Sequence, residues 1–263
     1  MIRSPLGLRI NVDPSRSPRD QIREAATLGA KGVVMDAAGD LAPDRLSDTG
    51  RRDLRHTLRS VELSLIALSL PTRRPFDSED GLDQRFERVD RAFALAYELG
   101  AKLVLLRAGA VPDETEVSKR TIFVHALTEL ARRADHRGIR LTIETGSEPG
   151  KVLAGIFDTI ASPGLAASLD PSSMLLQGHD PIAATSALGT WIAHAYAPDE
   201  SRSSTRGVKH PRGFGYASGA LNWEEYLGAL EEIGYRGFLT IWPEPLGDQA
   251  GTFREAKTSL DRF

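Results

Sequence analysis

Two carboxylates stand directly after short apolar runs and are candidates for chemistry. Glu144 ends the run LTIE, in which Leu141 and Ile143 alternate with polar residues. Asp170 ends the run LAASLD, and Pro171 stops that strand. If the two runs form neighbouring buried strands, both carboxylates come out at one rim, where they could transfer protons or bind a cation. The alternative is a solvated rim acid or a helix cap, and an Asp before Pro is also typical of a turn.

Further polar and aromatic residues stand at the ends of other apolar runs. They are Asn11, Asp36, Arg107, His194, Tyr196, Trp242 and Glu244. Because side chains alternate along a strand, His194 and Tyr196 can face the same cavity, as can Trp242 and Glu244. His194 could instead be a hydrogen-bonded core residue, and the two rings could simply line a pocket wall.

A basic segment, ESRSSTRGVKHPRG, follows the seventh apolar run and contains Arg206. If the chain folds as an α/β barrel, this segment lies where such barrels often bind phosphate. Arg206 could therefore clamp a phosphate or an acidic sugar. The alternative is a solvated surface loop.

Eight short apolar runs, separated by longer amphipathic segments, give the chain its organisation. They cover 6–12, 31–37, 63–70, 101–108, 139–145, 164–170, 191–197 and 237–243. Strands that alternate with helices indicate βαβ units and a parallel sheet. Eight units without a linker favour one (β/α)8 barrel domain over 1–263, in the α/β class. The first turn also lacks the G-x-G-x-x-G of a dinucleotide site.

The helices between these runs have recognisable start and stop signals. Ser17 before Pro18, Asp180 before Pro181, and Asn222 with Glu225 are typical of helix N-termini. Glycines stand where C-terminal caps are needed, at Gly29, Gly100, Gly138 and Gly234.

Composition narrows the classes of partner. The 263 residues are 41% hydrophobic with a formal net charge of −3, so no basic field favours nucleic acid or an anionic membrane. The absence of cysteine excludes disulfides and thiolate zinc sites. We find neither a signal peptide nor a run near the ~20 apolar residues of a membrane span. We therefore expect a cytoplasmic protein that binds a small molecule, and leave association into a homo-oligomer open.

Four segments in order carry a family resemblance. They are LTIETGSEPGKVL, SLDPSSMLLQGHDPIAA, WIAHAYAPD and GALNWEEYLGALEEIGYRGFLTI. Over nearly its whole length the chain resembles the xylose-isomerase-like TIM barrels, the sugar phosphate isomerase/epimerase superfamily. It looks closest to a branch with ETG-x-E after strand five and a DP-x-N-like motif after strand six.

The resemblance implies one divalent metal, usually Mn²⁺, Mg²⁺ or Co²⁺, held by a Glu, an Asp, a His and a second Glu. Glu144 matches the first Glu and Asp170 the Asp. Tyr196 stands in the position of the His, and Trp242 in that of the second Glu. Ser173 replaces a residue that is often His or Asn. The implied metal site is therefore degenerate, with half of its protein ligands missing.

Two hypotheses follow. In the first, the chain is a sugar isomerase or epimerase that works through an enediolate on a sugar or polyol, with Glu144 and Glu244 as acid/base and Asp170 as metal ligand or sugar contact. In the second, Tyr196 and Trp242 fill the metal space and the chain is a metal-free sugar-binding or regulatory protein. Phosphodiester cleavage would need several more His and carboxylate ligands than this sequence supplies, so nucleic acid is not expected as a partner.

Overall fold

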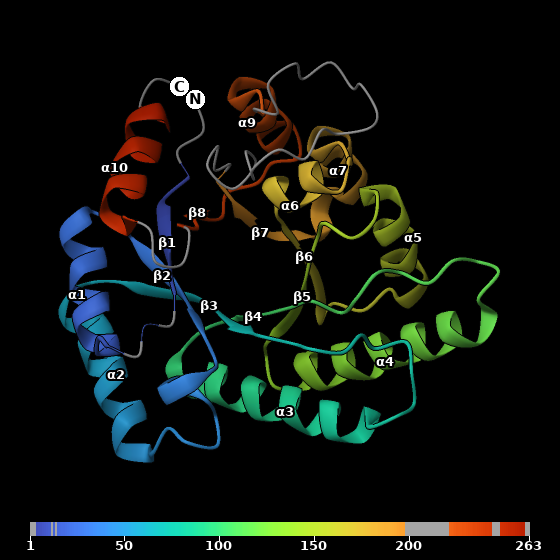
Figure 1. Ribbon diagram of the computed structural model, residues 1–263, viewed down its shortest axis with the longest axis horizontal. Coiled ribbons are helices and arrows are strands. Elements are labelled where there is room, and N and C mark those ends of the chain that lie inside the picture. The colour runs from blue at the N-terminus through green and yellow to red at the C-terminus, as the bar shows by residue number, and fades with distance from the viewer. Residues whose placement is uncertain (1–3, 12, 14, 198–220, 244–247, 261–263) are drawn as a thin grey trace.

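Eight parallel strands close into a barrel, in the order in which they occur along the chain (Figure 1). The computed structural model describes residues 4–11, 13, 15–197, 221–243 and 248–260. The strands are β1 (Leu6–Ile10), β2 (Gly32–Asp36), β3 (Ser64–Leu70), β4 (Leu103–Leu106), β5 (Arg140–Glu144), β6 (Leu165–Leu169), β7 (Ile192–Tyr196) and β8 (Leu239–Ile241). Each lies within its predicted run, so the predicted (β/α)8 barrel is confirmed.

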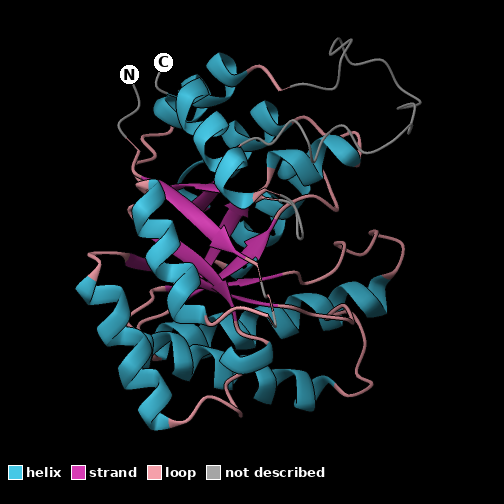
Figure 2. Ribbon diagram, turned by 60° about the vertical axis from the view of Figure 1, so that its left-hand side comes forward, coloured by secondary structure: helices cyan, strands magenta, loops and turns pink. Residues whose placement is uncertain are grey.

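Helices surround the barrel on the outside (Figures 1 and 2). They are α1 (Pro18–Leu28), α2 (Asp48–Ser60), α3 (Leu82–Leu99), α4 (Val117–His136), α5 (Gly150–Ile160), α6 (Pro171–Leu176), α7 (Pro181–Leu188), α9 (Trp223–Glu232) and α10 (Gln249–Leu260). Two short 3₁₀ turns cover Gly39–Leu41 and Gly189–Trp191. Within the described parts of the chain, no helix is long and apolar enough to cross a membrane.

The predicted helix caps are confirmed. The side chains of Ser17, Asp180 and Asn222 accept backbone N–H groups at the starts of α1, α7 and α9. Gly29 and Gly100 end α1 and α3 in the left-handed conformation that glycine adopts without strain. Gly138 and Gly234 take positive φ one residue beyond the caps of α4 and α9. These caps fix where each helix begins and ends around the barrel.

Strand alternation divides the core into an outer and an inner layer. Leu141 and Ile143 of β5 belong to the large outer cluster against the helices. A smaller cluster, which includes Ile66 and Tyr196, belongs to the other layer, with Phe238 packed against it. A Cβ on Gly32 would lie 2.7 Å from Ile66 and 2.9 Å from Phe238, so the amino-terminal end of the barrel is filled by side chains. The carboxyl ends of the strands therefore carry the polar interior.

Candidate active site at the carboxyl ends of the strands

The guanidinium of Arg9 lies at the centre of a hydrogen-bond network in the barrel interior. Its Nη1 donates to Glu144 Oε1 at 3.1 Å and to the Tyr196 hydroxyl at 2.5 Å. Its Nη2 donates to Asp36 Oδ1 at 2.8 Å and to Ser69 Oγ at 2.7 Å. One buried cation thus connects side chains from β1, β2, β3, β5 and β7.

Arg9 is not among the predicted site residues, because those residues were predicted from the ends of strands. Arg9 lies within β1, two residues before Asn11. The signal that could have found it is strand alternation, since Gly7, Arg9 and Asn11 share one face of the strand. A charged side chain on the inward face of a barrel strand needs partners of opposite charge or hydrogen bonds, because burying it alone is costly. Such a residue therefore indicates a functional or structural network.

Glu144 is held as a carboxylate by donors on both oxygens. Tyr196 donates to Oε1 at 3.0 Å, beside Arg9, and Arg107 Nε donates to Oε2 at 3.2 Å. Burial opposes its ionisation, but the two guanidinium groups and these hydrogen bonds hold the pKa of Glu144 below its usual value. Burial and the neighbouring carboxylate raise the pKa of Tyr196 well above that of a free tyrosine, so Tyr196 acts as a neutral donor.

Trp242 and Asn11 close the site on the β8 and β1 side. The Arg9 guanidinium carbon lies 3.7 Å from the centroid of the Trp242 ring, a cation–π contact. Trp242 Nε1 donates to Asn11 Oδ1 at 3.1 Å, and Asn11 Nδ2 donates to the Pro243 carbonyl at 2.9 Å. These contacts fix the indole over the cation.

The two carboxylates nominated from the sequence meet at one rim, with Arg107 between them. Arg107 Nη2 lies 3.9 Å from Asp170 Oδ2, while its Nε binds Glu144. Asp170 also caps α6, because its two oxygens accept the backbone N–H and the hydroxyl of Ser173 at 3.1 and 2.6 Å. The cap role that the sequence left open is therefore present, and it occurs together with the predicted juxtaposition.

His194 lies inside the barrel and has no exposed surface. Its Nδ1 is 2.8 Å from Ser168 Oγ and its Nε2 is 2.9 Å from Thr240 Oγ1. Burial, together with the charge of Arg9, lowers the pKa of His194 to about 3, so the ring is neutral. Of the two roles that the sequence allowed, the structure shows the hydrogen-bonded core residue.

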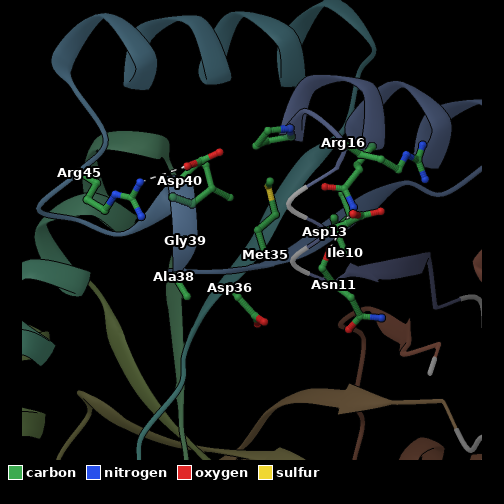
Figure 3. Close-up of a pocket in the computed structure, with 13 residues that line it drawn as sticks. Ile10, Asn11, Asp13, Arg16, Met35, Asp36, Ala38, Gly39, Asp40 and Arg45 are labelled. Carbon is green, nitrogen blue, oxygen red and sulfur yellow. Dashed lines mark hydrogen bonds and ion pairs between the residues drawn. The ribbon is translucent and has the colours of Figure 1, made fainter. Parts of the chain in front are cut away.

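Among the cavities lined by described residues, two flank the central cluster at this end of the barrel. One, of 350 Å³, lies between the segments that follow β1 and β2, with Asn11 and Arg16 on one side and Asp40 and Arg45 on the other (Figure 3). The other, of 330 Å³, is lined by Arg107 and Glu144 together with the loops after β3 and β4. Asp36 borders the first cavity and Glu144 the second, and Arg9 binds both carboxylates.

The described side chains do not fit the divalent cation that the resemblance implies. In the described part of the chain, no three His, Cys, Asp or Glu residues converge to hold a metal. A cation at Glu144 Oε1 would meet the Arg9 guanidinium, already 3.1 Å from that oxygen. Both Asp170 oxygens bind Ser173, whereas Mg²⁺ and related ions need about six oxygen ligands. The predicted residues Glu244 and Arg206 lie outside the described residues.

The model of the family described as "Xylose isomerase-like TIM barrel" matches residues 22–262 of this chain. Three solved structures share the fold: a xylose isomerase domain protein from Planctomyces limnophilus, a D-psicose 3-epimerase from Clostridium cellulolyticum H10 with D-tagatose, and a D-allulose 3-epimerase from Methylomonas sp. with D-allulose. In that order, identities are 20%, 16% and 17% and TM-scores 0.79, 0.78 and 0.77. The matches cover 98%, 98% and 100% of this chain and 95%, 97% and 98% of theirs. A search of curated proteins found no match.

Proposed function

The chain belongs to the xylose isomerase-like TIM barrel family, and from this membership we propose that it is a sugar isomerase or epimerase that uses arginine where the family resemblance implies a metal. The observation that carries the proposal is the position of Glu144. It lines a cavity together with Arg107, and Arg9 donates a hydrogen bond to it from the barrel interior. The substrate is a small sugar or polyol derivative with a carbonyl group.

Glu144 is the proposed proton acceptor. Its Oε1 is engaged by Arg9 and Tyr196, whereas Oε2 contacts only Arg107 among the hydrogen bonds described. Oε2 would take the proton from the carbon beside the carbonyl, and the electron pair would move onto the carbonyl oxygen. A carboxylate with a lowered pKa is a weak base, so the step needs strong stabilisation of the enediolate.

Arg107 is the proposed source of that stabilisation. Its side chain is 55% exposed and keeps donors for a ligand, because a guanidinium carries five N–H groups. Donors aimed at an oxygen that gains charge in the transition state lower the barrier of such reactions. In isomerisation, the proton returns from Glu144 to the former carbonyl carbon, and the hydroxyl proton of the deprotonated carbon moves to the former carbonyl oxygen. In epimerisation, a second acid, for which we propose Glu244, delivers a proton to the opposite face of the deprotonated carbon.

The rim residues are proposed to bind the substrate hydroxyl groups. Asn11, Asp36 and Ser173 supply polar atoms around the central cluster, and the Trp242 ring offers a flat surface to a sugar face. Asp170 is proposed as a sugar contact rather than a metal ligand, because the described side chains do not complete a metal shell around it.

A second candidate function is sugar binding or regulation without turnover. It is favoured by the hydrogen bonds of Glu144, because both carboxylate oxygens already accept hydrogen bonds from Arg9, Tyr196 and Arg107. In this case the same pocket would recognise the sugar but would not exchange its proton.

Proton exchange separates the two functions. A panel of ketoses and aldoses would be incubated in D₂O with EDTA, and deuterium incorporation beside the carbonyl followed by NMR. We expect exchange by the wild type, a loss of about 100-fold or more in Glu144→Gln, and retention in Glu148→Gln, a buried carboxylate four residues away. Sugar binding without exchange would favour the second function, and exchange only after added Mn²⁺ or Co²⁺ would contradict the arginine mechanism.

A further inference from the structure

The cavity beside Glu144 has a surplus of positive charge. Arg73 and Arg74, from the loop after β3, line it together with Arg107, and among the described residues Glu144 is the one acid in its lining. That carboxylate is already bound by Arg9 from the barrel interior. The described lining thus has three guanidinium groups and one carboxylate. Outside the lining, Arg107 also lies near Asp170 and Arg74 pairs with Asp80.

The loops that carry these arginines are packed firmly together. Thr72 Oγ1 donates to the Arg107 carbonyl at 2.6 Å, and the Phe76 N–H donates to the Ala108 carbonyl at 2.8 Å. Gly109, with φ of 98°, lies against Pro75 where a Cβ would collide with the proline ring. The backbone that positions the three arginines is thus fixed by contacts between the loops after β3 and β4.

Two of the arginines can turn to a ligand at little cost. Arg74 pairs with Asp80 at 2.7 Å, but both side chains are largely exposed, and such surface pairs contribute little. Arg73 is exposed and has no ion-pair partner among the described residues. A guanidinium binds carboxylate or phosphate with two parallel hydrogen bonds, which favours an anionic group over a hydroxyl.

We propose that the substrate carries an anionic group, a carboxylate or a phosphate, and that Arg73 and Arg74 bind it while Glu144 and Arg107 face the reactive carbons. The inference rests on the proposed function for the reacting end of the substrate. The 330 Å³ cavity reaches from Glu144 to these arginines, so one small sugar acid or sugar phosphate spans both.

The test is calorimetric binding of three ligands on one carbon skeleton: D-ribulose, D-ribulose 5-phosphate and D-ribonate. They would be compared in wild type, in the double variant Arg73→Ser/Arg74→Ser, and in Arg45→Ser. Arg45 is a matched control, because it lines the other cavity and pairs with Asp40 as Arg74 pairs with Asp80.

We expect at least one anion to bind about tenfold or more tightly than D-ribulose, because charge-assisted hydrogen bonds are stronger than neutral ones. The double variant should lose that advantage and Arg45→Ser should keep it. The phosphate and the carboxylate arms identify the group that is recognised. Equal binding of D-ribulose and the anions, an anion preference that survives in the double variant, or binding of none of the three would overturn the proposal.

The proposed enzyme activity and the proposed anion site can be tested independently. Anion binding that depends on Arg73 and Arg74, without proton exchange in the wild type, supports the anion site and contradicts the enzyme. Exchange of neutral sugars that is lost in Glu144→Gln, with no preference for anions, supports the enzyme and overturns the anion site.

Discussion

Arg9 sets the charge balance of the barrel interior. It contacts Glu144 and Asp36 directly, and the side chains of Arg9 and Glu144 are only 6% and 4% exposed. A buried cation of this kind does not by itself stabilise a protein, because its desolvation offsets its attraction to the carboxylates. Its removal, however, leaves the carboxylates without their partner.

Replacement of Arg9 by Met, which keeps the aliphatic part of the side chain and removes the guanidinium, is therefore expected to lower the free energy of unfolding by about 3–5 kcal/mol. Urea denaturation would measure the loss. The double variant Arg9→Met/Glu144→Gln should recover part of it, since the uncompensated charge is gone. A change of less than about 0.5 kcal/mol in the single variant would show that Arg9 does not hold Glu144.

At the level of elements, a buried polar contact joins the loops after β4 and β5. Glu148, in the loop after β5, accepts the backbone N–H of Val111 in the loop after β4 at 3.3 Å. Burial raises the pKa of Glu148 to about 7, although this hydrogen bond lowers it. The carboxyl group is protonated in the folded protein at a pH where it is ionised in the unfolded chain.

The sign of the pH dependence follows from that difference. Between about pH 4.5 and pH 7 the folded state binds more protons than the unfolded state at Glu148, so stability falls as pH rises. The free energy of unfolding of Glu148→Gln, relative to wild type, should increase by about 2–3 kcal/mol from pH 4 to pH 8. Denaturant titrations at several pH values would measure it, and a constant difference would contradict the raised pKa.

The positions of the strands and helices could be predicted from the sequence, because they depend on residues that are close together along the chain. Alternating runs gave the eight strands, and Ser17, Asp180 and Asn222 gave three helix starts. The partners of Arg9 could not be predicted in this way. They come from four other strands, and only closure of the barrel brings them to one point.

For the molecule as a whole, the parallel barrel places all strand ends at one rim, so residues far apart in sequence share one site. The sequence identified Tyr196 and Trp242 as departures from a metal-binding pattern, and the structure gives them a common partner. Tyr196 hydrogen-bonds Arg9, and Trp242 stacks on it. Tyr196 and Trp242 thus hold the guanidinium of Arg9, a cation supplied by the protein itself, in the barrel interior.

We propose that the Arg9 guanidinium takes the place of a divalent metal. The most direct measurement is Mn²⁺ binding, followed by electron paramagnetic resonance, with wild type and Glu144→Gln compared at equal chain concentration. We predict no stoichiometric binding in either protein, only weak association that the substitution does not change. One Mn²⁺ per chain bound at micromolar concentration by the wild type, and lost in Glu144→Gln, would show that a metal and not Arg9 occupies the centre of the site.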